Sequence, residues 1–498
     1  MIEIKRAAAL TYIGIFLTIL ITLFYTPLQI KFLGAEEFGV YSLVATFAIY
    51  LSILDLGLGN AVIRYISSSI EDTKENNILV GMFIKIFLVL GFFCALIGLG
   101  IYINIDNMFS SSLNPSQLND VKNMILILTL STAISLPLSV FGSIIQAHEK
   151  LIVFKFVNLL RIILVPVISI PLLFLDFKST SLIVVMALVN ISIMLYYAYY
   201  AVYVMKIAWD FKTNDYVLLK EVLTYSFYVF LNIIVDQIYW NTGQIILGVY
   251  GNATSIGVYA LSIQFIRVYM LCSTAISSLF LPKLTKIINQ EKDLSQVNQI
   301  FVKVGKIQFI ILSYILIGFG IFGEHFISIW AGKEFIEVYS TTLILMIALL
   351  IPLIQNVGIS ILQAMNKHAF RSILYVALAV SNLLLSVFLV KDYGEVGIAY
   401  STSIFLLVGN FLIMNLYYQY SIKMNMFMFW KGIFGLLVPI GLSLFISLLV
   451  ENLITNEGLF YFIKIVFFTL IYVILNFSFY RFSEIFPIKN PIKQTEGN

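Results

Sequence analysis

The sequence predicts an all-α polytopic membrane protein of about fourteen transmembrane helices, built as two six-helix lobes in parallel repeat plus two C-terminal helices. Three observations predict this fold class: the composition, the regular recurrence of apolar segments and an internal repeat. Of the 498 residues, 60% are hydrophobic and only 11% are charged, and the mean hydropathy is +0.98. A soluble core does not need so large an apolar fraction, so the solvent of this chain is the bilayer.

Apolar segments of about twenty residues recur along the chain with short polar breaks, and a helix of that length crosses the hydrocarbon layer. Windows of this length place the expected spans at 8–30, 40–66, 79–105, 122–147, 151–175, 181–208, 221–248, 257–282, 304–329, 340–365, 372–390, 397–421, 431–450 and 460–481. The first run follows Lys5 and Arg6 but has no clear small-residue cleavage site. We therefore interpret it as a spanning helix rather than a cleaved signal.

Lysine and arginine are unevenly distributed between the loops on the two sides of these spans. One side holds only Lys31, Lys122, Lys178, Lys333, Lys391 and Lys464, and most of the other loop cations lie on the opposite side. Because positively charged loops stay in the cytoplasm, this asymmetry predicts that both termini are cytoplasmic. The expected location is the cytoplasmic (inner) membrane of a bacterium.

Several functional classes are not expected from this sequence. The longest loops, near 105–121 and 282–303, are too short for a separately folding catalytic domain. The cysteines Cys94 and Cys272 lie in apolar spans, and the sequence has no cluster of residues with metal-ligand spacing. The cations follow the topology instead of forming a basic patch, so nucleic acid is not an expected partner. We do not expect an enzyme.

The two halves of the chain share short motifs at a nearly constant distance. FLGAEEFGVYSL in the first half is echoed by GVYGNATSIGVYAL in the second, where Gly251 matches Gly34. SIIQA returns as SILQA, and Gln363 follows Gln146 at the same separation as Gly251 follows Gly34. Chance similarity between apolar helices is the alternative, but the matches hold one register and include polar loops. The repeat is parallel because each copy has an even number of spans.

The repeat predicts three parts of the chain: a first lobe at 1–215, a second lobe at 216–430, and two additional helices with a cytoplasmic tail at 431–498. Two lobes related by an axis along the membrane normal can enclose a cavity that opens to either side in turn. This is an architecture typical of transporters.

Two stretches of the first half, FLGAEEFGVYSL (32–43) and LDLGLGNAVIRYI (54–66), and a third, GEVGIAYST (394–402), carry a family resemblance. They resemble the multidrug/oligosaccharidyl-lipid/polysaccharide (MOP) exporter superfamily, and within it the bacterial polysaccharide and O-antigen flippases, over nearly the whole chain. The resemblance implies two six-helix bundles in a V, with the appended pair forming a lateral groove for a lipid tail. It implies movement of a polyprenyl-pyrophosphate-linked oligosaccharide across the membrane for surface polysaccharide assembly, by alternating access.

Four cations within the spans are candidate substrate-binding residues. A pyrophosphate that crosses the membrane interior requires cations in a water-filled cavity, and intramembrane cations are costly to retain. Arg267 and Arg161 lie about ten residues into their spans and therefore near mid-depth. Arg64 and Lys85 lie closer to the cytoplasmic end. The alternative for the deeper two is a structural pair between helices, and for the shallower two it is snorkelling to the headgroups.

Two acids, Asp236 and Asp55, are also expected within spans. An intramembrane carboxylate can bind Na⁺, carry a proton or neutralise an arginine. Asp236 and Arg267 lie on adjacent spans at similar depth, so a salt bridge and separate roles both stay open. Asp55 belongs to a glycine-rich segment in which helix bending or close backbone approach is the structural alternative to ion coupling. No cofactor is expected, and coupling of transport to Na⁺ or H⁺ stays open.

The expected partners are a lipid-linked oligosaccharide, membrane lipids, and a polysaccharide polymerase or glycosyltransferase of the same assembly system. One alternative is an ion-coupled multidrug antiporter of the same superfamily, which would favour acidic rather than basic cavity residues. Another is a non-transporting membrane scaffold of a polysaccharide-synthesis complex. In a scaffold the buried charges would be structural, and their replacement by alanine would leave export intact.

Overall fold

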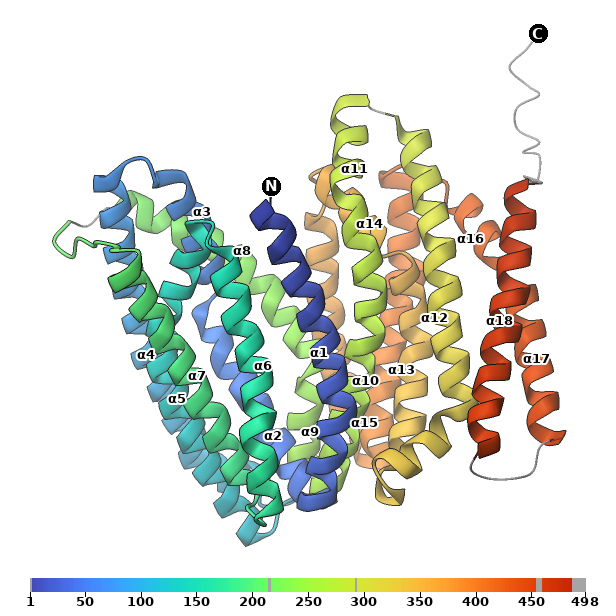
Figure 1. Cartoon of the computed structure of the whole chain (residues 1–498), viewed down its shortest axis with the longest axis horizontal. Helices are drawn as coiled ribbons and strands as arrows, with labels where there is room; N and C mark the ends of the chain where they lie inside the picture. Colours follow the sequence, from blue (N-terminus) through green and yellow to red (C-terminus); the bar gives the residue numbers. More distant parts are fainter. Residues whose placement is uncertain (1, 214–215, 292, 454–458, 486–498) are drawn as a thin grey trace. The chain divides into compact units, whose positions relative to one another are not determined.

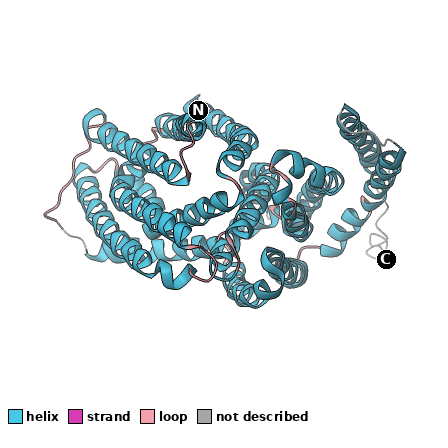
Figure 2. Cartoon of the chain, turned by 90° about the horizontal axis from the view of Figure 1, so that it is seen from below, coloured by secondary structure: helices cyan, strands magenta, loops and turns pink. Residues whose placement is uncertain are grey.

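The computed structural model describes residues 2–213, 216–291, 293–453 and 459–485, and every regular element in these ranges is helical (Figure 1). Figure 2 shows the same described chain as helices joined by short connections. These ranges contain 12 helical segments that are long and apolar enough to cross a membrane. The prediction of an all-α polytopic membrane protein is confirmed.

The expected number of about fourteen spans agrees with these segments once the longest is divided. The segment Ala369–Ser421 has 53 residues. Inside it Gly394 adopts a left-handed φ of 54°, which breaks the helix between the expected spans 372–390 and 397–421. One more helix, α18 (Leu459–Ile485), contains the apolar stretch Ile463–Asn476.

The helices gather into two compact units: Met1–Leu261 with Trp330–Phe335 and Ala379–Ile398, and Ser262–Ile329 with Ile336–Leu378 and Ala399–Asn498. The elements up to residue 277 are α1 (Ile2–Leu33), α2 (Ala35–Ser52), η1 (Ile53–Asp55), α3 (Leu58–Ser69), α4 (Thr73–Phe109), α5 (Pro115–Ala147), α6 (Leu151–Phe174), α7 (Ser179–Tyr199), η2 (Tyr200–Val204), α8 (Tyr216–Trp240), α9 (Thr242–Tyr250) and α10 (Ala253–Ser277). The remaining ones are η3 (Ser278–Phe280), α11 (Leu281–Lys286), η4 (Ile287–Glu291), α12 (Leu294–Trp330), η5 (Lys333–Phe335), α13 (Glu337–Ile354), α14 (Val357–Ala364), α15 (Ala369–Leu407), η6 (Val408–Met414), η7 (Tyr417–Ser421), α16 (Met426–Phe434), α17 (Leu437–Leu453) and α18.

In the first unit, α5 packs along α4 and α7, and α1 packs on α6. Helix α5 begins with a capping box, in which Asn114 accepts from the backbone N–H of Gln117 at 2.9 Å and the Gln117 side chain accepts from the backbone N–H of Asn114 at 3.0 Å. The core between these helices contains fully buried Phe83, Phe87 and Ile144. Helices α2 and α3, which together form the second expected span, pack on α5 as well, so this packing fixes α4 relative to both of them.

The local backbone repeats at the same distance as the sequence motifs. The π-helices η2 and η7 begin at matching positions of the two halves, and each is followed by a lysine in the left-handed region, Lys206 with φ 54° and Lys423 with φ 63°. The turns that follow α5 and α14 contain another matching pair, Glu149 with φ 60° and Asn366 with φ 57°. The sequence repeat is thus also a repeat of local conformation. The superposition of whole lobes, and the boundaries at 215 and 430, stay predictions.

Candidate functional site

The second expected span, 40–66, is broken in its middle. Leu56 and Gly57 have left-handed φ values of 52° and 73°, so the chain turns sharply between η1 and α3. The Asp55 carboxylate accepts a hydrogen bond from the backbone N–H of Gly57 at 2.7 Å, which holds the turn. A Cβ on Gly57 would lie 2.8 Å from Cγ1 of Val229 in α8. Interrupted spans are where membrane transporters commonly place their binding sites.

Polar side chains join this broken span to α8 and α9. The Tyr50 hydroxyl lies 2.6 Å from Oγ1 of Thr242 and donates to the carbonyl of Gln237 at 3.3 Å. The hydroxyl of Thr46 contacts Oε1 of Gln244, and both of these side chains are buried. We call this line of contacts, from Thr46 to Arg64 on one side and from Gln244 to Tyr225 on the other, the polar seam. Residues that come later in the α2–α3 segment pair with residues that come earlier in the α8–α9 segment, so these two segments run antiparallel.

Arg64 lies at the α3 end of the polar seam. Its guanidinium carbon is 4.7 Å from the ring centroid of Tyr225 in α8 and 5.7 Å from that of Tyr65. The two tyrosine rings are themselves in edge contact, with centroids 6.4 Å apart. The Arg64 side chain is exposed, and no carboxylate of the described chain forms an ion pair with it. The tyrosines therefore hold the flat face of the guanidinium, and its N–H groups stay available to an anion.

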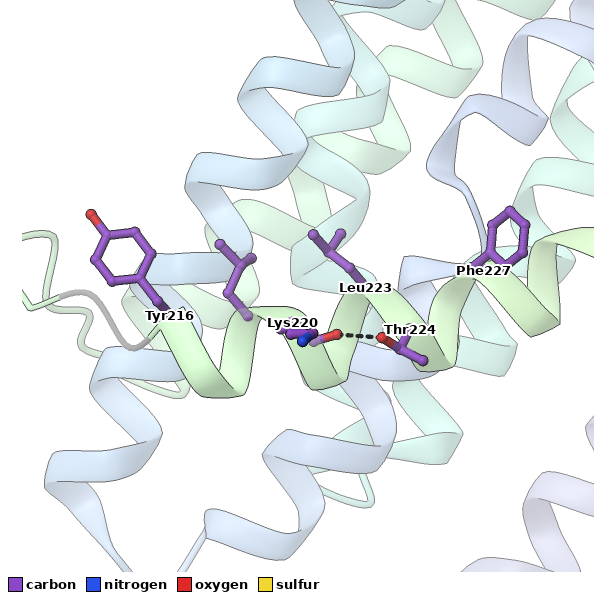
Figure 3. A pocket seen from close by; sticks show the side chains of 6 residues that line it. Tyr216, Lys220, Leu223, Thr224 and Phe227 are labelled. Carbon is purple, nitrogen blue, oxygen red and sulfur yellow. Dashed lines mark hydrogen bonds between the residues drawn. The ribbon is translucent and has the colours of Figure 1, made fainter.

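Helix α8 presents two different faces. Tyr225, Val229 and Asp236 recur along it at a spacing that places their side chains on one side, the side of the polar seam. The opposite side carries a groove of about 430 Å³. It is lined by Tyr216, Leu219, Lys220, Leu223, Thr224 and Phe227 (Figure 3). The side of α8 that faces the polar seam therefore carries Asp236, and the side that carries the groove is largely apolar.

The structure brings only some of the predicted site residues together. Asp55, Arg64 and the exposed Asp236 lie along the polar seam. Lys85 lies on α4 and donates a hydrogen bond to the carbonyl of Phe211 at 2.5 Å. The remaining two candidates, Arg161 on α6 of the first unit and Arg267 on α10 in the second, are exposed.

Sequence reasoning did not identify Tyr225, Tyr50 or Gln237 as site residues. The chain has 29 tyrosines, so no single one stood out by type. A usable signal was present at the start of α9, where Asn241, Thr242 and Gln244 interrupt an apolar segment. Among the described residues, no group of three or more His, Cys, Asp or Glu side chains is placed to hold a metal ion.

Known proteins match this chain over most of its length. The family described as polysaccharide biosynthesis protein matches residues 4–288. A putative O-antigen transporter of Shigella flexneri is 24% identical over 399 residues, which is 77% of this chain and 90% of that protein. The lipid II flippase MurJ, in an inward closed conformation, gives a TM-score of 0.76 at 18% identity, over 95% of this chain and 98% of that chain.

A multidrug resistance transporter of the MATE family in an inward-facing conformation is also similar. Its TM-score is 0.66 at 16% identity, and the match covers 82% of this chain and 96% of that one. At these identities the likeness to solved structures concerns the fold. The fold of this chain is therefore the one shared by these two membrane proteins.

Proposed function

The chain belongs to the polysaccharide biosynthesis protein family, and from this premise we propose that it is a flippase for a lipid-linked oligosaccharide. Its substrate in this proposal is a polyprenyl-pyrophosphate-linked oligosaccharide unit, which it moves across the cytoplasmic membrane for surface polysaccharide assembly by alternating access. The relatives support a transport role: one is named as a putative O-antigen transporter and another as a lipid II flippase.

The observation that carries this proposal is the setting of Arg64. An exposed guanidinium that stacks on Tyr225 and has no carboxylate partner in the described chain suits an anionic headgroup. Arginine binds phosphate oxygens through two parallel hydrogen bonds, and a stacked arginine loses little side-chain freedom when it does so. A multidrug antiporter for cations would favour an acid at this position, so the arginine supports the lipid-linked sugar.

The two acids of the polar seam suit different roles in this proposal. Asp55 accepts the hydrogen bond from Gly57 that holds the helix break, so its role is structural. Asp236 is exposed on the seam face of α8, which makes it the better candidate for coupling to Na⁺ or H⁺. A change in the charge of Asp236 would act on the helix that also positions Tyr225 beside Arg64.

Loss of the gene is expected to stop surface polysaccharide assembly while the lipid-linked unit accumulates on the cytoplasmic side of the membrane. The lipid-linked unit is labelled with a radioactive sugar precursor in right-side-out vesicles. Its accessibility from outside is then measured by digestion with an impermeant glycosidase. In the wild type, the labelled unit becomes accessible from outside, and in the deletion strain it stays protected. If the deletion strain lacks the lipid-linked unit altogether, the protein acts in its synthesis and the flippase proposal fails.

Arg267 and Asp236 are expected to show whether the second lobe also contributes a substrate cation. If Arg267 contacts the pyrophosphate, Arg267→Ala stops export at near-normal protein abundance, because water can solvate the vacated position, and lysine restores part of the export. If it instead pairs with Asp236, the double neutral variant recovers what Arg267→Ala loses. The measurement is a double-mutant cycle scored by surface polysaccharide and membrane abundance. Full export by Arg267→Ala would exclude an essential role in substrate binding.

A further inference from the structure

The segment between α7 and α8, residues 205–213, is an irregular strap that lies on the first turns of α4. The backbone N–H of Asp210 donates to the carbonyl of Asn77 at 2.8 Å, and Nζ of Lys85 donates to the carbonyl of Phe211 at 2.5 Å. A Cβ on Gly81 would overlap the carbonyl of Asp210, so only glycine permits this approach of the two backbones. The strap is therefore pinned to α4 along its backbone.

The acid of the strap is occupied within the strap itself. The Asp210 carboxylate accepts hydrogen bonds from Oγ1 of Thr213 at 2.6 Å and from the backbone N–H of Lys212 at 2.7 Å. These hydrogen bonds, the one from Thr213 foremost, hold the pKa of Asp210 below its ordinary value. Asp210 therefore stays ionised near neutral pH, and its oxygens hold the turn that presents Lys212.

The strap presents aromatic rings and ammonium groups outward. Trp209 is 38% exposed and Phe211 is 46% exposed, and their ring centroids are 6.2 Å apart. Tyr203, just before the strap, is 70% exposed. Lys206 and Lys212 on either side of Trp209 are exposed as well. Amphipathic rings with neighbouring lysines are typical of the headgroup layer of a membrane, where rings and cations both find partners.

The strap lies at the end of the first unit that also carries the N-terminus (Figure 1). The charge asymmetry of the loops predicts that this end is cytoplasmic. The cytoplasmic leaflet is the one whose surface is negatively charged by anionic lipids, and lysines near it add to binding. The exposed lysines of the strap therefore complement the negative charge of the anionic lipids in this leaflet.

We propose that the strap is a binding surface for anionic lipid headgroups of the cytoplasmic leaflet. Trp209 and Phe211 insert at headgroup level, and Lys206 and Lys212 pair with lipid phosphates. Lys85 is then a positioning residue that holds the strap on α4 through the Phe211 carbonyl. This inference goes beyond the proposed flippase function, because it concerns bulk lipids and its test needs no transported substrate.

The test places the purified full chain in nanodiscs that contain either brominated phosphatidylglycerol or brominated phosphatidylcholine at the same mole fraction. Bromine quenches tryptophan fluorescence at short range, and the contribution of Trp209 is the difference between the parent protein and Trp209→Phe. We expect both lipids to quench Trp209 and the anionic lipid to quench it more strongly. The Lys206→Gln/Lys212→Gln variant should lower the enrichment of anionic lipid by about fivefold for each lysine removed.

Lys423→Gln is the matched control, because Lys423 follows its π-helix in the second lobe as Lys206 does in the first. It should leave the enrichment of anionic lipid at Trp209 unchanged. Equal quenching by the two lipids, or no quenching of Trp209 by either, would overturn the proposal. So would loss of the enrichment in Lys423→Gln. If inorganic phosphate at constant ionic strength abolishes the enrichment, the lysines bind a soluble anion and the assignment to lipid is wrong.

Discussion

Arg64→Ala is expected to lower export of the lipid-linked oligosaccharide by at least about tenfold, since a hydrogen bond to a charged group contributes about 1.5–3 kcal/mol. The abundance of the protein should stay near normal, because the Arg64 side chain is exposed and no carboxylate of the described chain is left unpaired. Arg64→Lys should recover only part of the export, since an ammonium does not offer the planar pair of donors. Vesicle transport of labelled substrate and immunoblotting of membranes measure the two quantities.

Arg371→Ala is the matched control for Arg64→Ala. Arg371 in α15 also stacks on a tyrosine, with its guanidinium carbon 4.3 Å from the ring centroid of Tyr375, but it belongs to the second unit and is not part of the polar seam. We expect it to leave export near the parent value. Tyr225→Phe should export nearly as well as the parent, whereas Tyr225→Ala should approach the defect of Arg64→Ala. Normal export by Arg64→Ala would show that Arg64 does not bind the substrate, and the flippase proposal would lose its main structural support.

The class of fold was predictable because it follows from the apolar composition and from the length and recurrence of the apolar segments, which can be read directly from the sequence. Helix bending at the glycine-rich segment that contains Asp55 was one of the alternatives left open by the sequence, and the structure shows a break there, at Leu56 and Gly57. The window 40–66 is predominantly apolar and counts as one span, so the exact position of the turn was not predictable. The turn depends on a left-handed Leu56, a conformation that leucine disfavours. The adjacent Gly57 was the visible signal, and the structure adds a reason for glycine there, because a Cβ on Gly57 would lie 2.8 Å from Cγ1 of Val229.

The superfamily resemblance carried by the motifs at 32–43 and 54–66 is confirmed by the family match and by the fold shared with MurJ and a MATE transporter. Part of the polar seam was also predictable from the sequence, since Asp55, Arg64 and Asp236 stand out as charged residues in apolar surroundings. The position of Tyr225 beside Arg64 was not, because a single sequence does not fix how two distant helices align.

Gly39→Ala is expected to destabilise the protein by about 3 kcal/mol or more, an effect at the upper end for added volume in a packed site. Gly39 in α2 faces the start of α10, and a Cβ there would overlap the carbonyl of Ala253. Gly257, the residue that matches Gly39 in the repeat, lies at the same contact, since a Cβ on it would be 3.4 Å from Cα of Gly39. Glycine at both matched positions lets α2 and α10 approach closely, as small residues do between membrane helices.

The control for Gly39→Ala is Gly100→Ala, in α4. No atom lies within 4 Å of the position that a Cβ on Gly100 would take, so alanine adds no clash there. Its higher helix propensity should leave stability unchanged or raise it by up to about 1 kcal/mol. Fluorescence-detected size exclusion after a heating series compares the two variants in detergent. Gly39→Ala should yield little monodisperse protein at temperatures where the parent and Gly100→Ala remain intact. Equal melting of all three would mean that α2 and α10 do not require the close contact at Gly39.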